Sequence, residues 1–192
     1  GATAVLALLL GVPLAFSLVR ARFRGRALLD RLALAPIIVP TIILSVAIYG
    51  LFAKLKLIGT WYGLVVAHTV LALPFVVLVI AAGLRDFDRS LEQAAEGLGA
   101  SRWKTLMRIT LPLLRPSLVS AGLLAFISSF DEVVVALFLA GANMTLPKKM
   151  FDNIMMEIDP TIAAVSVMQI LLVSVVVGKM DTGRSAGLSS TS

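Results

Sequence analysis

The segment Trp61–Leu84 contains no acidic residue, lysine or arginine, and it is longer than the run of about 20 apolar residues that a helix needs to cross a bilayer. Four further segments meet or approach that length: Ala2–Val19, Leu32–Phe52, Leu118–Leu139 and Thr161–Val177. Apolar residues occupy 59% of the 192 positions, more than a soluble domain of this size can bury. The sequence therefore predicts an all-α, polytopic membrane bundle with five spans, in a domain covering residues 1–180.

The basic residues are unevenly distributed between the links that join these spans. All but four of the 17 Lys and Arg residues lie in residues 20–31, in the long polar loop 85–115, or after the last span. The four exceptions are Lys54, Lys56, Lys148 and Lys149. Basic residues concentrate on the cytoplasmic side of membrane proteins. We therefore expect loop 85–115 and the tail to be cytoplasmic, Gly1 to be outside, and the positive charge to reflect topology rather than a nucleic-acid partner.

Both ends of the chain carry expectations of their own. Gly1 enters an apolar segment that lacks a positive n-region, so we expect no signal peptide. Because Gly1 is predicted to lie outside the cytoplasm, we also expect that an earlier span is missing. Residues 181–192 are rich in Ser, Thr and Gly, which predicts a disordered tail.

The loop 85–115 has the pattern of a short amphipathic helix followed by a second one. Four residues recur at i, i+3, i+4 and i+7: Leu91, Ala94, Ala95 and Leu98. Gly99 suits a helix end that turns through positive φ, and Ser101 suits the N-cap of a helix over residues 101–110. Two interpretations fit: a helix resting on the membrane surface, or a docking helix whose small residues let it lie deep in a partner's groove.

An acidic pair, Asp131 and Glu132, lies within the predicted fourth span. At about 1.5 Å per residue from Pro116, it lies roughly 22–24 Å into a core about 30 Å thick. Charged side chains at that depth are costly and mark function by default. Glu132 shares a stripe with small residues, and Asp131 falls near Ser128 at its edge; the stripe is Ala121, Ala125, Ser129, Ala136 and Ala140. The pair indicates a path for a cationic solute, an interhelical hydrogen-bonded pair, or a helix break.

Several chemistries find no support in the sequence. No Gly-Lys-Ser/Thr phosphate loop exists, so the chain is not expected to hydrolyse ATP itself. With one histidine and no cysteine, neither a metal site nor a disulfide framework is expected. His68 is expected to make an interhelical hydrogen bond. A Ser nucleophile would need Ser128 or Ser129 beside His68, and nothing in the sequence supports that arrangement.

The loop carries Gln93-Ala94-Ala95, then three residues and Gly99, then nine residues and Ile109-Thr110-Leu111-Pro112. It resembles the Glu-Ala-Ala-(three)-Gly-(nine)-Ile-x-Leu-Pro pattern of the integral membrane subunits of ATP-binding-cassette (ABC) importers. One departure is that Gln93 stands at the family's leading Glu, with Glu92 one place earlier. Residues 129–139, 145–147 and 160–166 look like the spermidine/putrescine branch of these permeases.

The resemblance implies a type I ABC importer permease fold with six spans, of which this chain shows five, in a bacterial inner membrane. It implies a coupling helix over residues 93–99 seated in a separate ATPase subunit. The residues expected in that coupling are Glu92, Gln93, Ala94, Ala95, Leu98, Gly99, Ala100, Ile109, Leu111 and Pro112.

The implied partners are an ABC ATPase dimer that holds the ATP, a second permease subunit, identical or different, and an external solute-binding protein. The chain itself is expected to be no enzyme and to bind no cofactor directly. Its expected solute path includes Asp131, Glu132 and Ser128, and the expected solute is a polyamine such as spermidine or putrescine.

Three alternatives remain. The solute could be another small molecule, such as an opine or an amino-acid derivative. A secondary transporter could use Asp131 or Glu132 as a proton relay without ATP. A membrane scaffold that only recruits a cytoplasmic partner would explain the loop but not the acidic pair. Co-purification of an ATPase subunit separates the permease from the secondary transporter.

Overall fold

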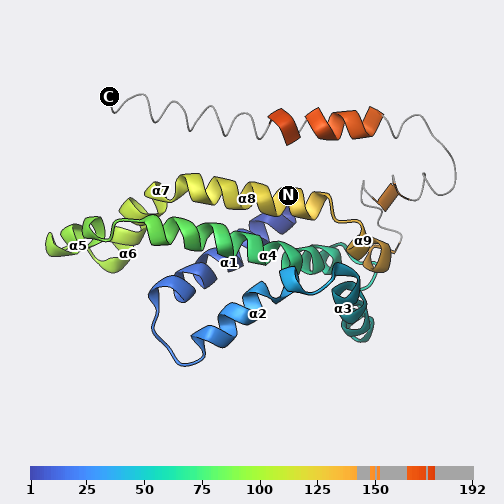
Figure 1. The fold of residues 1–192 in the computed structure, drawn as a ribbon, viewed down its shortest axis with the longest axis horizontal. Helices are drawn as coiled ribbons and strands as arrows, with labels where there is room; N and C mark the ends of the chain where they lie inside the picture. Colours follow the sequence, from blue (N-terminus) through green and yellow to red (C-terminus); the bar gives the residue numbers. More distant parts are fainter. Residues whose placement is uncertain (142–147, 150, 152–163, 172, 176–192) are drawn as a thin grey trace. The chain divides into compact units, whose positions relative to one another are not determined.

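The computed structural model describes residues 1–141, 148–149, 151, 164–171 and 173–175 (Figure 1). It divides into two units, Gly1–Thr145 and Leu146–Ser192. In the second unit, residues 164–171 and 173–175 are helical. The expected last span, Thr161–Val177, begins and ends outside the described residues, and the predicted tail 181–192 lies wholly outside them. No strand occurs in the described part of the chain, which confirms the all-α prediction.

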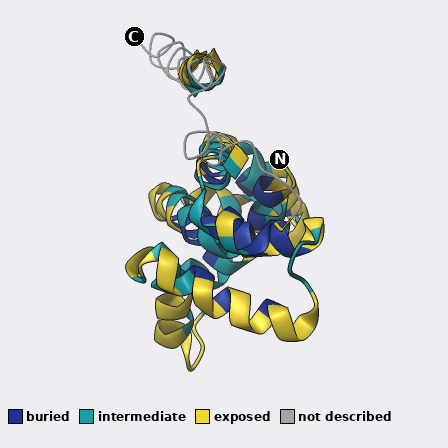
Figure 2. Cartoon of the chain, turned by 90° about the vertical axis from the view of Figure 1, so that its right-hand side faces the viewer, coloured by how far each residue is buried: buried dark blue, intermediate teal, exposed yellow. Residues whose placement is uncertain are grey.

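Three helices build the larger core of the first unit: α1 (Ala2–Arg20), α4 (Trp61–Asp86) and α8 (Arg115–Phe130). Each packs against the other two, and glycines allow the close approach. A Cβ added to Gly11 would lie 2.6 Å from Val76 Cγ1, and one added to Gly122 would lie 3.0 Å from Leu8 Cδ1. Figure 2 shows this buried centre beside largely exposed helices. Five buried alanines line the same core: Ala7, Ala15, Ala72, Ala121 and Ala125.

The predicted second span, Leu32–Phe52, is not one helix. Instead α2 (Arg26–Ile38) and α3 (Thr41–Leu55) meet at an angle of 110°. The break falls at Val39, whose backbone angles are extended, and at Pro40, whose ψ of 131° is not helical. Proline has no N–H to donate and disfavours helical angles at the preceding residue, so Pro40 explains the break.

The predicted fourth span, Leu118–Leu139, is also interrupted. Helix α8 ends at Phe130, Asp131 is its C-cap, and α9 covers only Val134–Leu139. Two local effects explain the break. The Glu132 side chain accepts a hydrogen bond from the backbone N–H of Val135 at 3.1 Å, which competes with a helical arrangement. Three consecutive β-branched residues follow, Val133–Val135, and these favour helix less than straight side chains do.

Helix α9 belongs to a second apolar cluster, which also takes in α3 and the beginning of α4. Ala136 and Ala140 lie in this cluster, whereas Ala121 and Ala125 lie in the larger core. The single small-residue stripe that was expected to run through Glu132 is therefore wrong. It assumed a continuous helix, and the break at residues 131–133 sends its two halves to different neighbours.

Only some of these helices could cross a membrane without a break. Among the described residues, α1 and α4 each have the length and apolar character of a span. Two bent pairs reach it only when each pair is taken as one span: α2 with α3, and residues 102–113 with α8, bent by 68°. This makes two to four candidate spans in the described part of the chain, compared with the five expected from the whole sequence.

Candidate functional site

The polar loop between α4 and α8 folds into four short helical pieces: α5 (Ser90–Gly97), α6 (Arg102–Thr105), the π-helix η1 (Leu106–Thr110) and α7 (Leu111–Leu113). Asp88 initiates α5. Its carboxylate accepts hydrogen bonds from the Ser90 backbone N–H at 2.8 Å and from the Ser90 hydroxyl at 2.7 Å. These bonds, the backbone one foremost, hold the pKa of Asp88 below its usual value. Ser101 caps α6 by accepting from the Lys104 N–H at 3.3 Å.

Gly99 terminates α5 as the sequence predicted. Its φ is 84°, in the left-handed region that favours glycine. Its N–H donates to the carbonyl of Glu96, and the N–H of Ala100 donates to the carbonyl of Ala95, each at 3.0 Å. This pair of bonds is a Schellman motif, which satisfies the carbonyls that a helix end would otherwise leave free. Gly99 therefore sets the angle at which the chain leaves α5 and enters α6.

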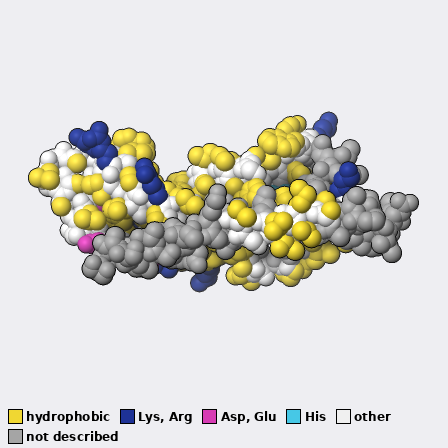
Figure 3. Space-filling model, turned by 90° about the horizontal axis from the view of Figure 1, so that it is seen from above, with side chains coloured by type: hydrophobic (Ala, Val, Ile, Leu, Met, Phe, Trp, Pro, Cys, Tyr) yellow, Lys and Arg dark blue, Asp and Glu magenta, His cyan; other side chains and the backbone are white. Residues whose placement is uncertain are grey.

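The outer surface of this loop carries large apolar side chains that the rest of the described chain does not cover. Leu98 is 91% exposed and Trp103 is 68% exposed, with Leu91 and Met107 also exposed. Gln93 and Ala94 are exposed as well, whereas Ala95 and Ala100 are half-buried, as are Ile109, Leu111 and Pro112. Figure 3 shows hydrophobic side chains beside Lys and Arg side chains at the end of the first unit that carries α5 and α6. The predicted apolar face is therefore present and open.

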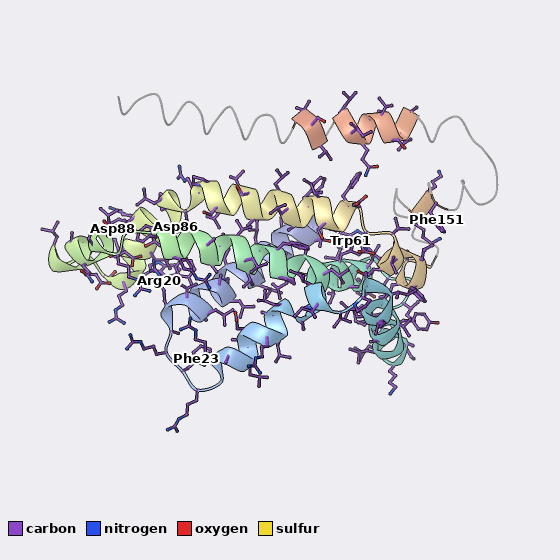
Figure 4. All side chains as sticks on the ribbon, in the orientation of Figure 1. Arg20, Phe23, Trp61, Asp86, Asp88 and Phe151 are labelled. Carbon is purple, nitrogen blue, oxygen red and sulfur yellow. The ribbon has the colours of Figure 1, made fainter. Side chains whose placement is uncertain are left out.

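Glu92 does not share this outward orientation. Its carboxylate accepts from Arg20 Nη1, at 2.7 Å to Oε1 and 2.9 Å to Oε2, and from the hydroxyl of Thr110. Arg20 is the last residue of α1 (Figure 4). The ion pair therefore joins the end of α1 to α5. Sequence reasoning assigned Glu92 to a contact with a partner and missed Arg20 and Thr110. Their only sequence signals were a charge beside a span and a polar residue within the Ile-x-Leu-Pro pattern.

The acidic pair lies at the break between α8 and α9. Asp131 is exposed, and Glu132 is half-buried with Oε1 on the Val135 N–H. Ser128, in the last turn of α8, is half-buried. The helix-break interpretation of the pair is confirmed, although a helix break and a solute path do not exclude each other. Within the described residues, no three His, Asp or Glu side chains gather as a metal site would require.

His68 of α4 makes the interhelical contact that the sequence predicted. Its Nδ1 lies 3.1 Å from the carbonyl oxygen of Ser129 and 3.3 Å from the Ser129 hydroxyl oxygen. A carbonyl can only accept, so Nδ1 carries the proton that it donates. That proton occupies the lone pair with which Nδ1 would have to activate the Ser129 hydroxyl. The contact is structural, although it brings together the serine and histidine that a nucleophilic pair would need.

Comparisons with known proteins agree with the resemblance that the loop pattern predicts. A family model described as "Binding-protein-dependent transport system inner membrane component" matches residues 7–180. The spermidine/putrescine transport system permease protein PotC of Haemophilus influenzae is 34% identical over 170 residues, 88% of this chain and 66% of that protein. The putrescine transport system permease protein PotI of Escherichia coli is 35% identical over 181 residues, 90% of this chain and 64% of that protein.

A sulfate system is similar to the chain as well. The sulfate transport system permease protein CysT of Escherichia coli is 35% identical over 143 residues, which cover 68% of this chain and 52% of that protein. The chain thus spans about two thirds or less of the length of these curated relatives. Among solved structures, the inward-facing MetNI methionine ABC transporter matches with a TM-score of 0.76 at 19% identity, over 96% of this chain and 88% of that one. This match confirms the fold, and the fold alone.

Proposed function

Because the chain belongs to the family of inner membrane components of binding-protein-dependent transport systems, we propose that it forms the permease of an ABC importer for a small cationic solute of the polyamine class. The family match over residues 7–180 confirms the resemblance that the loop pattern predicted, and with it the inner-membrane location. The activity, the solute and the partners are proposals for this chain.

The observation that carries the proposal is the open apolar face of α5 and α6. Leu98 at 91% exposure and Trp103 at 68% lie on a polar loop outside the apolar helices, where burial against a partner would remove them from water. In an importer the partner that meets this loop is the ATPase subunit. The small, exposed side chain of Ala94, on the same helix turn as Leu98, lets the helix approach such a partner closely.

The energy for transport comes from that partner, because this sequence has no phosphate-binding loop. ATP bound by an ATPase dimer draws the α5 helices of two permease subunits together, and the spans switch from facing in to facing out. Solute then enters from an external binding protein. Such switching selects between two packed states and involves no covalent chemistry in the permease.

The cationic character of the solute rests on the acidic pair. Relatives from polyamine and sulfate systems have nearly equal identity to this chain, so overall similarity does not select the charge of the solute. Asp131 and Glu132 place two carboxylates beside the C-terminal end of α8, and a helix C-terminus itself carries partial negative charge. Both features favour a cation and disfavour sulfate. In other transporters the C-terminal ends of broken helices coordinate cations.

The first experiment tests docking. The chain is expressed with the ATPase, second permease and binding protein that we expect to be encoded beside it, and the complex is purified in detergent. The ATPase should co-purify with the wild type and with Leu98→Met, which keeps the apolar volume. Leu98→Glu should lose most of it, because burying an unpaired carboxylate is strongly unfavourable. Equal recovery of the ATPase with Leu98→Glu would contradict the docking assignment.

The second experiment tests transport. Vesicles containing the complex should accumulate radiolabelled putrescine or spermidine when ATP is supplied, and should not accumulate sulfate. Replacement of the ATP-binding lysine in the ATPase should abolish uptake. Uptake that survives this replacement and depends on a proton gradient would identify a secondary transporter instead. Uptake of sulfate would contradict the cationic solute.

A further inference from the structure

The contacts of Glu92 define a joint between segments that are far apart in the sequence. Arg20, at the end of α1, and Glu92, in the first turn of α5, are 72 positions apart, and Thr110, at the end of η1, is 18 positions from Glu92. One carboxylate therefore connects α1, α5 and η1. We name Arg20, Glu92 and Thr110 together the Glu92 joint.

The surroundings of the joint shield it from water. The side chains of Arg20 and Glu92 are 22% and 16% exposed, and Thr110 is fully buried. The Arg20 guanidinium carbon lies 5.1 Å from the ring centre of Phe16 and 5.6 Å from that of Phe87, within range of cation–π attraction. Partial burial reduces the screening that makes surface ion pairs weak.

Apart from the Glu92 joint and the short backbone link to α4 through residues 87–89, helix α5 has little to hold it to α1, α4 and α8. None of its residues is buried, and its main neighbours are α6 and η1, which belong to the same loop. By contrast, α1 packs along α4 and α8. A displacement of α5 consequently reaches the core of the first unit through the Glu92 joint more directly than through apolar packing.

The π-helix η1 supports the same conclusion. Single-turn π-helices are rare and occur often at functional sites, and this one ends at Thr110, whose hydroxyl donates to Glu92. The chain then passes through α7 into α8. The joint thus reaches α8 along the backbone as well as α1 through its ion pair.

We propose that the Glu92 carboxylate is a positioning residue that transmits movement of the coupling helix α5 to α1 and η1, and that it does not itself contact the ATPase. This inference rests on the proposed function. It assigns to Glu92, Arg20 and Thr110 the conversion of ATP-driven movement of α5 into rearrangement of the spans. Loss of the joint should therefore separate ATP hydrolysis from transport while the ATPase remains bound.

The test compares Glu92→Gln with Asp86→Asn in the assembled importer. Both remove one carboxylate charge near the same end of the first unit, but Asp86 is exposed and makes no ion pair in the described structure. Glu92→Gln should keep ATPase co-purification, because the outer face of α5 is unchanged. Solute taken up per ATP hydrolysed should fall about tenfold or more, the scale expected for one charge-assisted hydrogen bond. Asp86→Asn should behave as the wild type.

Three further variants make the test decisive. Arg20→Gln alone and together with Glu92→Gln should give the same loss as Glu92→Gln, because all three variants break the same Arg20–Glu92 ion pair. Thr110→Val replaces the hydroxyl with a methyl group and leaves the Arg20–Glu92 ion pair in place. It therefore tests the joint if Glu92→Gln does not assemble, and it should lower uptake per ATP with the ATPase still bound. Uptake per ATP at the wild-type level in the assembled variants would overturn the joint. A wild-type chain that recruits no ATPase would instead overturn the proposed function.

Discussion

His68 Nδ1 lies 3.1 Å from the carbonyl oxygen of Ser129, one residue before α8 ends. The last carbonyls of an α-helix have no intrahelical partner, and the break after Phe130 leaves this one inside the bundle rather than in water. His68 is only 4% exposed, so the bond is made in an apolar setting. The histidine of α4 therefore supplies the hydrogen bond that a continuous helix would have supplied.

Replacement of His68 should destabilise the bundle according to the donor that remains. His68→Leu leaves the Ser129 carbonyl without a donor and should cost about 1–3 kcal/mol in the free energy of unfolding. His68→Gln keeps an N–H donor and should cost less. Thermal unfolding in detergent, followed by circular dichroism, measures both. Equal thermal unfolding midpoints for His68→Leu and the wild type would show that the Ser129 carbonyl finds another hydrogen-bond donor.

Gly11 should be intolerant of even one methyl group. A Cβ there would lie 2.6 Å from Val76 Cγ1 and 2.9 Å from Val76 Cβ, and a β-branched side chain cannot rotate its own Cβ away. Gly11→Ala should therefore cost about 1–3 kcal/mol through overpacking, and Val76→Ala should recover part of it. Gly50→Ala is the matched control, since a Cβ added at Gly50 would meet nothing within 4 Å and alanine favours helix. A control as unstable as Gly11→Ala would refute the packing argument.

The local features of the cytoplasmic loop could be predicted from the sequence because they depend on neighbours in the chain. The spacing of Leu91, Ala94, Ala95 and Leu98 predicts α5, and Gly99 marks its end. Both rest on the 3.6-residue period and on the conformational freedom of glycine. His68 could be assigned an interhelical partner because a lone polar side chain in a span needs one, although its partner Ser129 could not be named.

The features that could not be predicted depend on contacts between distant segments or on competition at one point. Apolar residues continue on both sides of residues 131–133, so hydropathy indicates one span where the Glu132 side chain and the Val133–Val135 run produce two helices. Arg20 likewise fits the positive-inside pattern so well that its charge needed no further explanation. Its pairing with Glu92 follows only from the packing of α1 beside the loop.

Gly99→Ala should impair coupling, because alanine at φ 84° carries about 1 kcal/mol of backbone strain. A backbone change that relieves this strain would alter the angle between α5 and α6. ATPase co-purification and ATP-driven uptake should both fall. Gly97→Ala provides the control. Gly97 lies inside α5, a Cβ added there would meet nothing within 4 Å, and its φ is not positive. Similar behaviour of the two variants would mean that the Schellman turn has no role in docking.

The predicted orientation is open to a direct labelling test because the chain has no native cysteine. Single cysteines in place of Lys54 and Arg24 should differ in access. The basic residues place Lys54 outside and Arg24 in the cytoplasm. A membrane-impermeant maleimide should modify Lys54→Cys in intact cells and Arg24→Cys only after permeabilisation. The reverse pattern would invert the topology and remove α5 from any cytoplasmic ATPase.

The stripe of small residues favours Glu132 over Asp131 as the carboxylate that lines a path, but the broken helix favours Asp131. The two carboxylates should therefore affect cation transport unequally. Glu132 Oε1 already accepts from the Val135 N–H, whereas Asp131 is exposed and forms no ion pair with the described residues. A carboxylate without a protein partner is the better one to offset the hydration that an ammonium group loses in the path.

Asp131→Asn should therefore lower polyamine uptake at least about tenfold, the factor that corresponds to losing about 1.4 kcal/mol of charge-specific stabilisation. Glu132→Gln should lower it less, because the amide oxygen keeps the hydrogen bond to Val135 while the charge is lost. Both variants should unfold at the wild-type midpoint, and Asp86→Asn serves as the charge-matched control. Initial rates of radiolabelled putrescine uptake measure the effect. Wild-type rates in both amide variants would make the pair purely a helix terminator, and the polyamine assignment would then rest on the relatives alone.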